Sequence, residues 1–272
     1  MNKATTYRAL LRQSFFVMIL ALLNASVAKA EQRRILSLSA AATHILTALG
    51  KAPVAIDQYG LIAAGEPAPP VLGRGSAISL EKVSELQINC VILWYYQNDA
   101  ERLFRKRGIE TVSLQPLRLN TYPELLTKLG DLSNSQAKAN ELRSRFESDL
   151  QAVSTWQRDK EPVRVYFELY SEWKAVGNQS FLGDLLKTAG GLCPADKSGL
   201  ISPERILEFA PEVIFFVGGY ADANELARRP GLASSPAVRN KRLYAVDRRL
   251  ITEGLAIIEA IEFFRQQLTA TR

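Results

Sequence analysis

The chain has 272 residues, of which 47% are hydrophobic and 23% are charged, a profile typical of a globular protein long enough for two domains. Its formal net charge is +6, but residues 1–30 hold four lysines and arginines and no acid, so the remainder carries only +2. This small excess does not indicate a nucleic-acid-binding protein, and we expect no nucleic-acid partner.

Residues 1–30 are predicted to be a secretory signal peptide. Basic residues come first, an apolar run follows over residues 15–23, and residues 28–30 fit a small-x-small cleavage site. The apolar run is shorter than a membrane-spanning helix requires. The residue directly after the cleavage site is not a cysteine, so nothing there indicates a lipid anchor. We therefore expect cleavage near Ala30 and a mature protein located in the periplasm.

Residues 31–119 form the predicted amino-terminal lobe, in which short apolar strands alternate with helices. A first helix is predicted to open at residues 39–43, a second to begin after the N-cap residue Ser79, and a third to begin at Ala100. The predicted strands cover residues 35–38, 54–56, 90–94 and 111–114, and a loop rich in proline and glycine covers residues 61–76. The unbroken apolar run at residues 90–94 is typical of a strand buried on both faces of a parallel sheet.

Residues 120–160 are predicted to be linking helices. A first short helix begins near Pro123 and ends around residues 130–134, where glycine and small polar residues interrupt the pattern. From Ser135 onward apolar residues recur every three or four positions up to Trp156, between charged faces. About 25 uninterrupted helical residues would span roughly 38 Å, the width of a small domain. The alternative is an ordinary surface helix of a single domain.

Residues 161–272 form the predicted carboxy-terminal lobe and repeat the alternation. The predicted elements are strands at 163–169, 213–217 and 243–246, and helices at 181–189, after the N-cap residue Ser202, and at 257–268. Such alternation implies parallel α/β sheets. The predicted fold class is therefore α/β, with two Rossmann-like lobes of mainly parallel sheet connected by a single long helix.

The two cysteines are predicted not to form a disulfide bond. Cys90 lies within an apolar run, and Cys193 follows a Gly-Gly turn in the other half of the chain. A buried free thiol suits such an apolar setting.

A similar six-residue motif occurs in both halves of the chain. Residues 78–83 (ISLEKV) and residues 201–206 (ISPERI) each precede an apolar strand. Because the motif precedes an apolar strand in both halves, we expect its two copies to have a paired structural role.

Four further groups of residues make the chain similar to a known family. They are LSAAATHIL with ALG at residues 38–50, VLG with ISLE at 71–81, FLGDLL with AGG at 181–191, and SPE with APEVI at 202–214. In this order and spacing they resemble substrate-binding proteins of ABC importers for iron chelates (siderophores and haem) and cobalamin. The resemblance covers nearly all of the predicted mature chain.

The resemblance implies a fold of the class III periplasmic binding protein type, with two lobes joined by a long helix and no enzymatic activity. The implied partners are an ABC permease dimer with its ATPase and a metal-chelate or corrinoid ligand. We expect a monomer with no cofactor and no metal site of its own. The resemblance also implies that Glu81 and Glu204, one in each lobe, dock onto arginines of the permease. The alternative is that both are first-turn acids that stabilise their helices by about 0.3–1 kcal/mol each.

The ligand cleft is expected between the lobes, where the carboxyl ends of the strands meet. Two kinds of residue follow these strand ends, aromatic residues and a pair of arginines. They are Tyr59, Trp94, Tyr95, Tyr96, Tyr170, Trp173, Tyr220, Arg248 and Arg249. The aromatic residues would give a flat lining for a large conjugated ligand, and the arginines would pair with anionic oxygens of a chelate. The alternatives are core packing for each aromatic residue and a solvated surface pair for the arginines.

The identity of the ligand stays open between two classes. The arginine pair favours an anionic ferric siderophore, whereas Trp94, which matches a cleft tryptophan of cobalamin-binding relatives, favours a corrinoid. We place the iron chelate first and cobalamin second. Because the lobes are joined by a helix, we expect only a small closing motion.

His44 is the only histidine of the chain and departs from the family pattern, which has glutamate there. A buried or capping role is expected for it, although haem-binding relatives often ligate iron through histidine or tyrosine. With one histidine, no G-x-S-x-G motif and no Walker lysine, the sequence argues against a hydrolase, a zinc site or a nucleotide cradle. An exported hydrolase acting on a chelate is the distant alternative.

Overall fold

The computed structural model describes residues 33–75, 77–154 and 161–270. The predicted signal peptide, including the cleavage site near Ala30, lies outside these residues, and so does the end of the predicted long helix, residues 155–159. Among the described residues, no helix combines the length and the apolar character that crossing a membrane requires.

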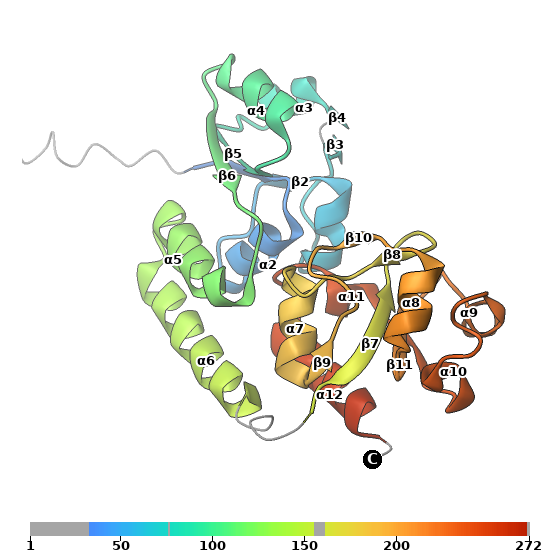
Figure 1. The fold of residues 1–272 in the computed structure, drawn as a ribbon. Helices are drawn as coiled ribbons and strands as arrows, with labels where there is room; N and C mark the ends of the chain where they lie inside the picture. Colours follow the sequence, from blue (N-terminus) through green and yellow to red (C-terminus); the bar gives the residue numbers. More distant parts are fainter. Residues whose placement is uncertain (1–32, 76, 155–160, 271–272) are drawn as a thin grey trace, which may run out of the picture. The chain divides into compact units, whose positions relative to one another are not determined.

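The first sheet has four parallel strands in the order β2-β1-β5-β6 (Figure 1). Its region contains β1 (Ile35–Ser37), α2 (Ala40–Ala48), β2 (Ala55–Ile56), η1 (Gln58–Ala63), β3 (Gly73–Arg74), β4 (Ala77–Ile78), α3 (Leu80–Glu85), β5 (Cys90–Trp94), α4 (Asn98–Arg105) and β6 (Glu110–Leu114). Residues alternate between the two faces of β5: Cys90 and Ile92 pack with α2, whereas Val91 and Leu93 pack with α3 and α4. The strand is buried on both faces, as its unbroken apolar run predicts.

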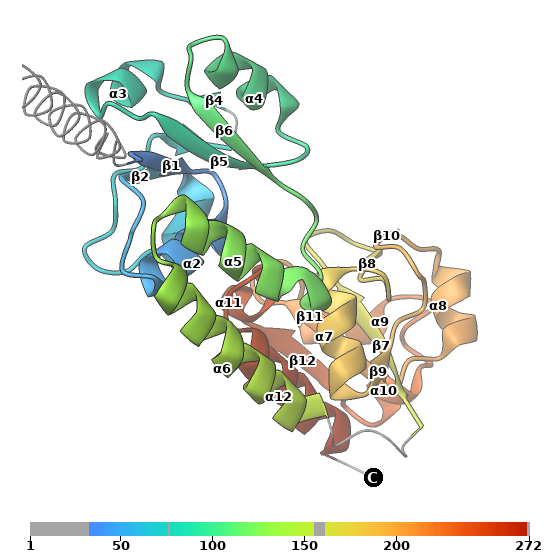
Figure 2. The ribbon, with the colours of Figure 1, turned by 90° about the vertical axis from the view of Figure 1, so that its left-hand side faces the viewer.

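Two helices follow β6 through the short turn η2 (Leu119–Thr121). They are α5 (Tyr122–Leu132) and α6 (Gln136–Ser154), which pack antiparallel (Figure 2). Gly130 lies inside α5, and a Cβ added there would lie 2.3 Å from that of Ala139 on α6, so glycine permits the close approach. The helices are separated by Asn134 at a φ of +53°. The apolar stripe of α6 is confirmed, because Ala139, Phe146 and Val153 are buried.

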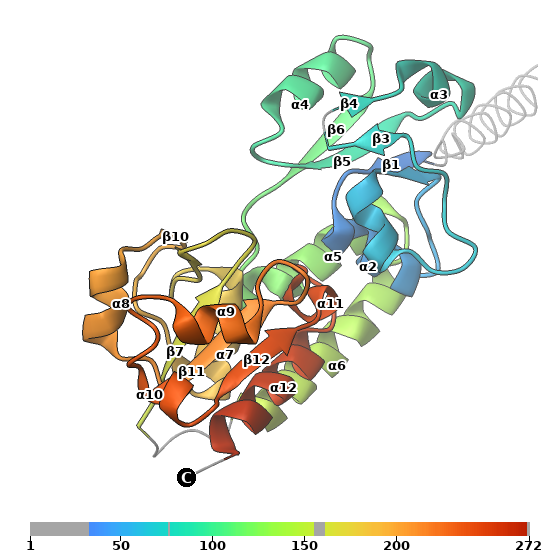
Figure 3. The same ribbon diagram turned by 90° about the vertical axis from the view of Figure 1, so that its right-hand side faces the viewer.

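The second sheet has six strands, of which β7, β9, β11 and β12 run parallel and β8 and β10 form an antiparallel edge (Figure 3). Its region contains β7 (Val163–Glu168), β8 (Lys174–Ala175), α7 (Phe181–Ala189), β9 (Gly191–Leu192), β10 (Gly199–Leu200), α8 (Pro203–Phe209), β11 (Val213–Val217), α9 (Ala223–Arg228), α10 (Pro236–Arg239), β12 (Leu243–Val246), α11 (Arg248–Ile251) and α12 (Ile257–Thr269). Phe167 and Phe215 face α7 and α12, whereas Tyr166 and Phe216 face α8 and α9.

The predicted fold class is confirmed, with corrections to detail. The segment at 61–76, predicted to be a loop, contains the end of η1 and the strand β3, which pairs with β4. The antiparallel strands β8 and β10 and the short helices α9, α10 and α11 were not predicted. Residues 34–272 form one compact unit in which one core cluster includes side chains from both sheets, so the residue boundaries of the lobes stay a prediction. Cys90 and Cys193 are buried, and no disulfide bond joins them.

Candidate functional site

A pocket of about 730 Å³ lies at the carboxyl ends of the parallel strands of both sheets. Segments that follow β2 and β5 line it from the first sheet, and segments that follow β7 and β12 line it from the second. Parallel strands end at a common edge, so residues far apart in the sequence meet there. The volume lies within the range of small-molecule sites.

Six of the nine residues predicted for the cleft line this pocket. They are Tyr59, Trp94, Tyr95, Tyr96, Tyr170 and Arg248. Trp94, which ends β5 of the first sheet, and Arg248, which begins the helix after β12 of the second sheet, therefore share one cavity. The pocket also includes Leu182 and Phe181 from the start of α7, which add apolar surface.

Three tyrosines of the pocket take part in edge-to-face ring contacts. Tyr95 and Tyr96 have ring centroids 5.4 Å apart, and Tyr170 packs against Tyr220 at 5.0 Å. Tyr96 is 63% exposed, so its ring is available to a ligand. The pocket thus presents phenol oxygens and flat apolar faces at once.

Arg74, which sequence reasoning missed, lies at the edge of this site. Its Nε donates to the Tyr59 hydroxyl at 3.0 Å, and its guanidinium lies 5.6 Å from the centre of the same ring. It stands on β3, within the segment predicted to be a loop, so no strand end pointed to it.

Two carboxyl groups in the pocket were also missed. Asp57 is buried and accepts the backbone N–H groups of Gly60 at 3.0 Å and Gly75 at 3.3 Å. Burial raises the pKa of Asp57 in spite of these hydrogen bonds, and burial raises the pKa of Glu253 to about 7. Asp57 directly follows β2, so the strand-end rule would have found it, whereas Glu253 follows the short helix α11 and carries no such signal.

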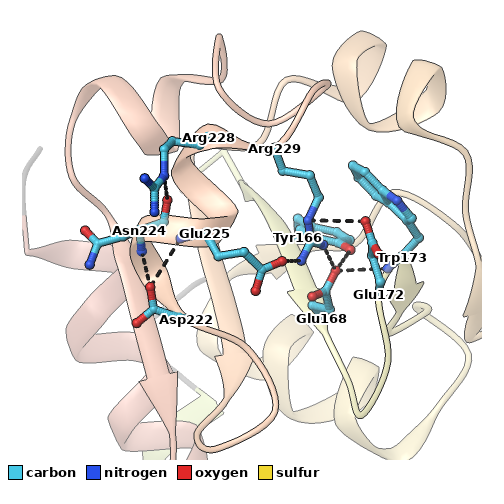
Figure 4. Close-up of polar contacts among 9 residues, drawn as sticks. All are labelled: Tyr166, Glu168, Glu172, Trp173, Asp222, Asn224, Glu225, Arg228 and Arg229. Atoms are coloured by element: carbon cyan, nitrogen blue, oxygen red, sulfur yellow. Dashed lines mark hydrogen bonds and ion pairs between the residues drawn. The ribbon is translucent and has the colours of Figure 1, made fainter.

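Three predicted residues do not line the pocket. Trp173 packs instead against Arg229, whose guanidinium lies 5.1 Å from the ring centre, and against Tyr166 (Figure 4). Arg249 forms an ion pair with Glu259. Tyr220 supports the ring of Tyr170 without lining the cavity. The arginine pair is therefore divided, and only Arg248 faces the site.

His44 lies away from this pocket. It is half-buried in α2 and lines a smaller hollow of about 240 Å³ beside Tyr122 and Phe146. Burial lowers the pKa of His44, and the charge of Arg249 lowers it further. His44 was expected to be buried or to cap a helix, but it lies within α2 and is partly exposed. Among the described residues, no group of three or more His, Cys, Asp and Glu side chains is placed to hold a metal ion.

The two predicted docking residues are exposed in the first turns of short helices. Glu81 stands in α3, which is capped by Ser79, and Glu204 stands in α8, which is capped by Ser202. The pKa of Glu204 is lowered by its own backbone N–H and by the Ser202 hydroxyl. Each side chain is therefore exposed and accessible to a partner.

Comparison with known proteins identifies the family. The family model of periplasmic binding proteins matches residues 35–250, and the chain belongs to this family. Members of the family bind ligands rather than transform them. No curated protein sequence is significantly similar.

Solved structures of the class III type share the fold. The periplasmic haem-binding protein BhuT, in complex with two haems, matches with a TM-score of 0.78 at 17% identity over 88% of this chain and 98% of that chain. The haem-binding protein HutB of Vibrio cholerae matches with 0.75 at 21% over 88% and 99%. The vitamin B12-binding protein BtuF of Vibrio cholerae matches with 0.74 at 22% over 88% and 97%. At these identities the likeness shows the fold alone.

Proposed function

We propose that the protein is the substrate-binding component of an ABC importer and that it captures a flat ferric chelate of the haem type in the pocket between the two sheets. The observation that carries the proposal is the grouping of four tyrosines and Trp94 around one cavity that also holds Arg248. Haem-binding and vitamin B12-binding proteins share the fold, which is consistent with a large ligand.

The phenol groups favour ferric iron. Tyrosine oxygen is a known axial ligand of haem iron, and the aromatic faces would pack against a conjugated macrocycle. His44 lies outside the pocket, so Tyr59, Tyr96 and Tyr170 supply the candidate axial ligands.

The charges of the pocket favour a ligand with few negative groups. Arg248 can pair with one carboxylate through a two-point contact, whereas Arg249 is occupied by Glu259. The cavity also contains the acids Asp57 and Glu253. A highly anionic siderophore was favoured because two arginines were expected in the pocket. With one arginine and two acids there, the pocket is better suited to a macrocycle that carries a few carboxylate groups.

Cobalamin is the second candidate, and Trp94 is the observation that favours it. Its ring lies at the end of β5, in the wall of the pocket, where it would support the face of a corrin. A corrinoid needs no phenolate ligand, so the two candidates make different demands on the tyrosines.

The partners follow from the family role. We propose that Glu81 and Glu204 dock onto a permease dimer served by an ATPase, and that the monomer works in the periplasm after cleavage near Ala30. The two glutamates belong to the two copies of the six-residue motif, one before β5 and one before β11, which supports a paired role.

Calorimetric titration of the purified mature protein with haem, cobalamin and a ferric siderophore tests the proposal. We expect saturable one-to-one binding of haem that is tighter than binding of the other two. Tighter binding of cobalamin would favour the second candidate, and binding of none of the three would contradict both.

A further inference from the structure

Arg229, at the C-terminus of α9, contacts three carboxylates although its side chain is only 7% exposed (Figure 4). Its Nη1 donates to Glu168 Oε2 at 2.5 Å, its Nη2 pairs with Glu225, and its Nε lies 3.6 Å from Glu172 Oε1. The ring of Trp173 lies against the same guanidinium. Although burial favours the neutral form, hydrogen bonds to Glu168 and Glu225 outweigh it and raise the pKa of Arg229, which therefore stays charged.

The carboxylate of Glu168 holds the turn that follows β7. It ends that strand, and its Oε2 accepts the backbone N–H of Trp173 at 3.0 Å. The turn is closed by the Leu169 N–H, which donates to the Lys174 carbonyl at 2.8 Å. Trp173 has a φ of +60°, a conformation that costs free energy for a tryptophan and persists only where the surroundings enforce it. Tyr170, which lines the pocket, lies within this turn.

A second turn is tied to the same guanidinium through α9. Asp222 caps this helix by accepting the backbone N–H groups of Asn224 and Glu225, and Glu225 then pairs with Arg229. Tyr220 lies two residues before the cap, and its ring packs edge-on against Tyr170 at 5.0 Å. One buried cation thus joins the turn that carries Tyr170 to the turn that carries its packing partner.

We propose that Arg229 is a positioning residue for the pocket: it sets the place of Tyr170, and of Tyr220 behind it, by holding both turns through Glu168 and Glu225. The proposal rests on the proposed function of the pocket, because it assigns Tyr170 to ligand binding. A buried ion pair such as Arg229–Glu168 is a costly way to fill a core compared with apolar side chains, and it fixes one arrangement of the groups that it joins. Trp173, which sequence reasoning placed in the cleft, acts here as part of the support for Tyr170.

The test compares Arg229→Lys with Arg228→Lys. Lysine keeps the charge, so the buried carboxylate of Glu168 is not left without a cation, but it lacks the planar fork that reaches several acceptors at once. Arg228 is the matched control because it is the exposed neighbour in α9 and donates to the Asn224 carbonyl at 3.1 Å. Haem titration followed by absorbance should show about tenfold weaker binding for Arg229→Lys and unchanged binding for Arg228→Lys. Equal affinity of both variants would overturn the proposal.

A double-mutant cycle separates positioning from general destabilisation. In the variant Tyr170→Ala/Tyr220→Ala, addition of Arg229→Lys should cause no further loss of haem affinity, because the rings through which Arg229 acts are gone. A further loss of about tenfold in that background would show that Arg229 acts by another route and would overturn the proposal.

Hydrogen exchange of the ligand-free protein tests the same idea without any ligand. In Arg229→Lys the backbone amides of Trp173 and Lys174 should exchange faster than in the parent protein, while those of β11 stay protected. Unchanged exchange in the turn would overturn the positioning role. If the parent protein binds none of the three ligands, the proposed function fails, and this exchange measurement still decides the role of Arg229.

Discussion

Arg118 and Asp184 join the segment after β6 to the first turn of α7 through a two-point ion pair. Arg118 Nε donates to Asp184 Oδ2 at 2.7 Å and its Nη2 donates to Oδ1 at 2.5 Å, while the Leu119 N–H donates to Oδ2 at 3.0 Å. Pro116 lies two residues before Arg118, Leu182 lies two residues before Asp184, and both line the pocket. The contact therefore joins two segments that line the cavity, one after β6 and one at the start of α7.

Replacement of Asp184 by Asn should destabilise the protein by about 1–2 kcal/mol, because a charge-assisted contact to the Arg118 guanidinium is lost. Urea unfolding followed by circular dichroism measures this. Glu124→Asn is the matched control, since Glu124 is an exposed acid in the first turn of α5 and should change the free energy of unfolding by less than about 0.5 kcal/mol. Equal effects of the two substitutions would show that the ion pair does not contribute.

Glu253 should make the stability fall as pH rises. Burial raises its pKa from an ordinary value of 4.5 to about 7, so between these values the folded state binds the proton that the unfolded state has lost. The contribution to stability is complete below pH 4.5 and disappears as pH rises through 7. Its size is on the order of 2 kcal/mol, since partial exposure screens the effect.

Urea unfolding of the parent protein and of Glu253→Gln at pH 5 and pH 8 checks this prediction. The parent should lose stability relative to the variant between the two pH values. Asp57 is present in both proteins, so its own titration cancels from the difference. Parallel pH profiles would mean that Glu253 titrates in the folded protein as it does in the unfolded chain.

Arg248 and Arg249 should differ in their effect on ligand affinity. Arg248 lines the pocket, and loss of a charged hydrogen bond to a ligand carboxylate weakens binding by roughly 10–100-fold. Arg249 is paired with Glu259, so Arg249→Gln serves as the matched control for Arg248→Gln. We expect haem titration to show weakened binding for the first position only, and similar losses at both would place Arg249 in the site after all.

Glu81 and Glu204 should be needed for transport and not for ligand capture. The double variant Glu81→Ala/Glu204→Ala should abolish uptake of the ligand by cells and leave the dissociation constant of the purified protein unchanged. The control is Glu85→Ala/Glu208→Ala, which alters exposed acids later in the same two helices. Unchanged uptake in the first variant would assign both residues to helix stabilisation alone.

Much of the fold was predictable, because apolar runs and N-cap residues determine the longer elements. Ser79 and Ser202 cap the helices that they were predicted to cap, and residues 90–94 and 213–217 form buried strands. The two-residue strands β8 and β10 carry no pattern of their own. β8 pairs with β7 and with β10, and these pairings form only after the turn that follows β7 has reversed the chain.

The candidate site was predictable only as far as strand ends determine it. Trp94 ends a parallel strand, and Tyr59 and Tyr170 follow parallel strands closely, so the carboxyl ends of the strands bring them together. Trp173 lies where the turn has already reversed toward an antiparallel strand. Arg248 and Arg249 are neighbours in the short helix α11, where consecutive side chains point about 100° apart, so only one faces the pocket.

The central claim is that the cavity shared by the two sheets is the ligand site, and tyrosine nitration footprinting with and without one equivalent of haem tests it most directly. Tyr96 and Tyr170 line the cavity from different sheets, whereas Tyr244 on β12 lies outside it and serves as the internal reference. The proposed site predicts that haem protects Tyr96 and Tyr170 together and leaves Tyr244 unchanged. Bound haem with unaltered nitration of both pocket tyrosines would contradict it.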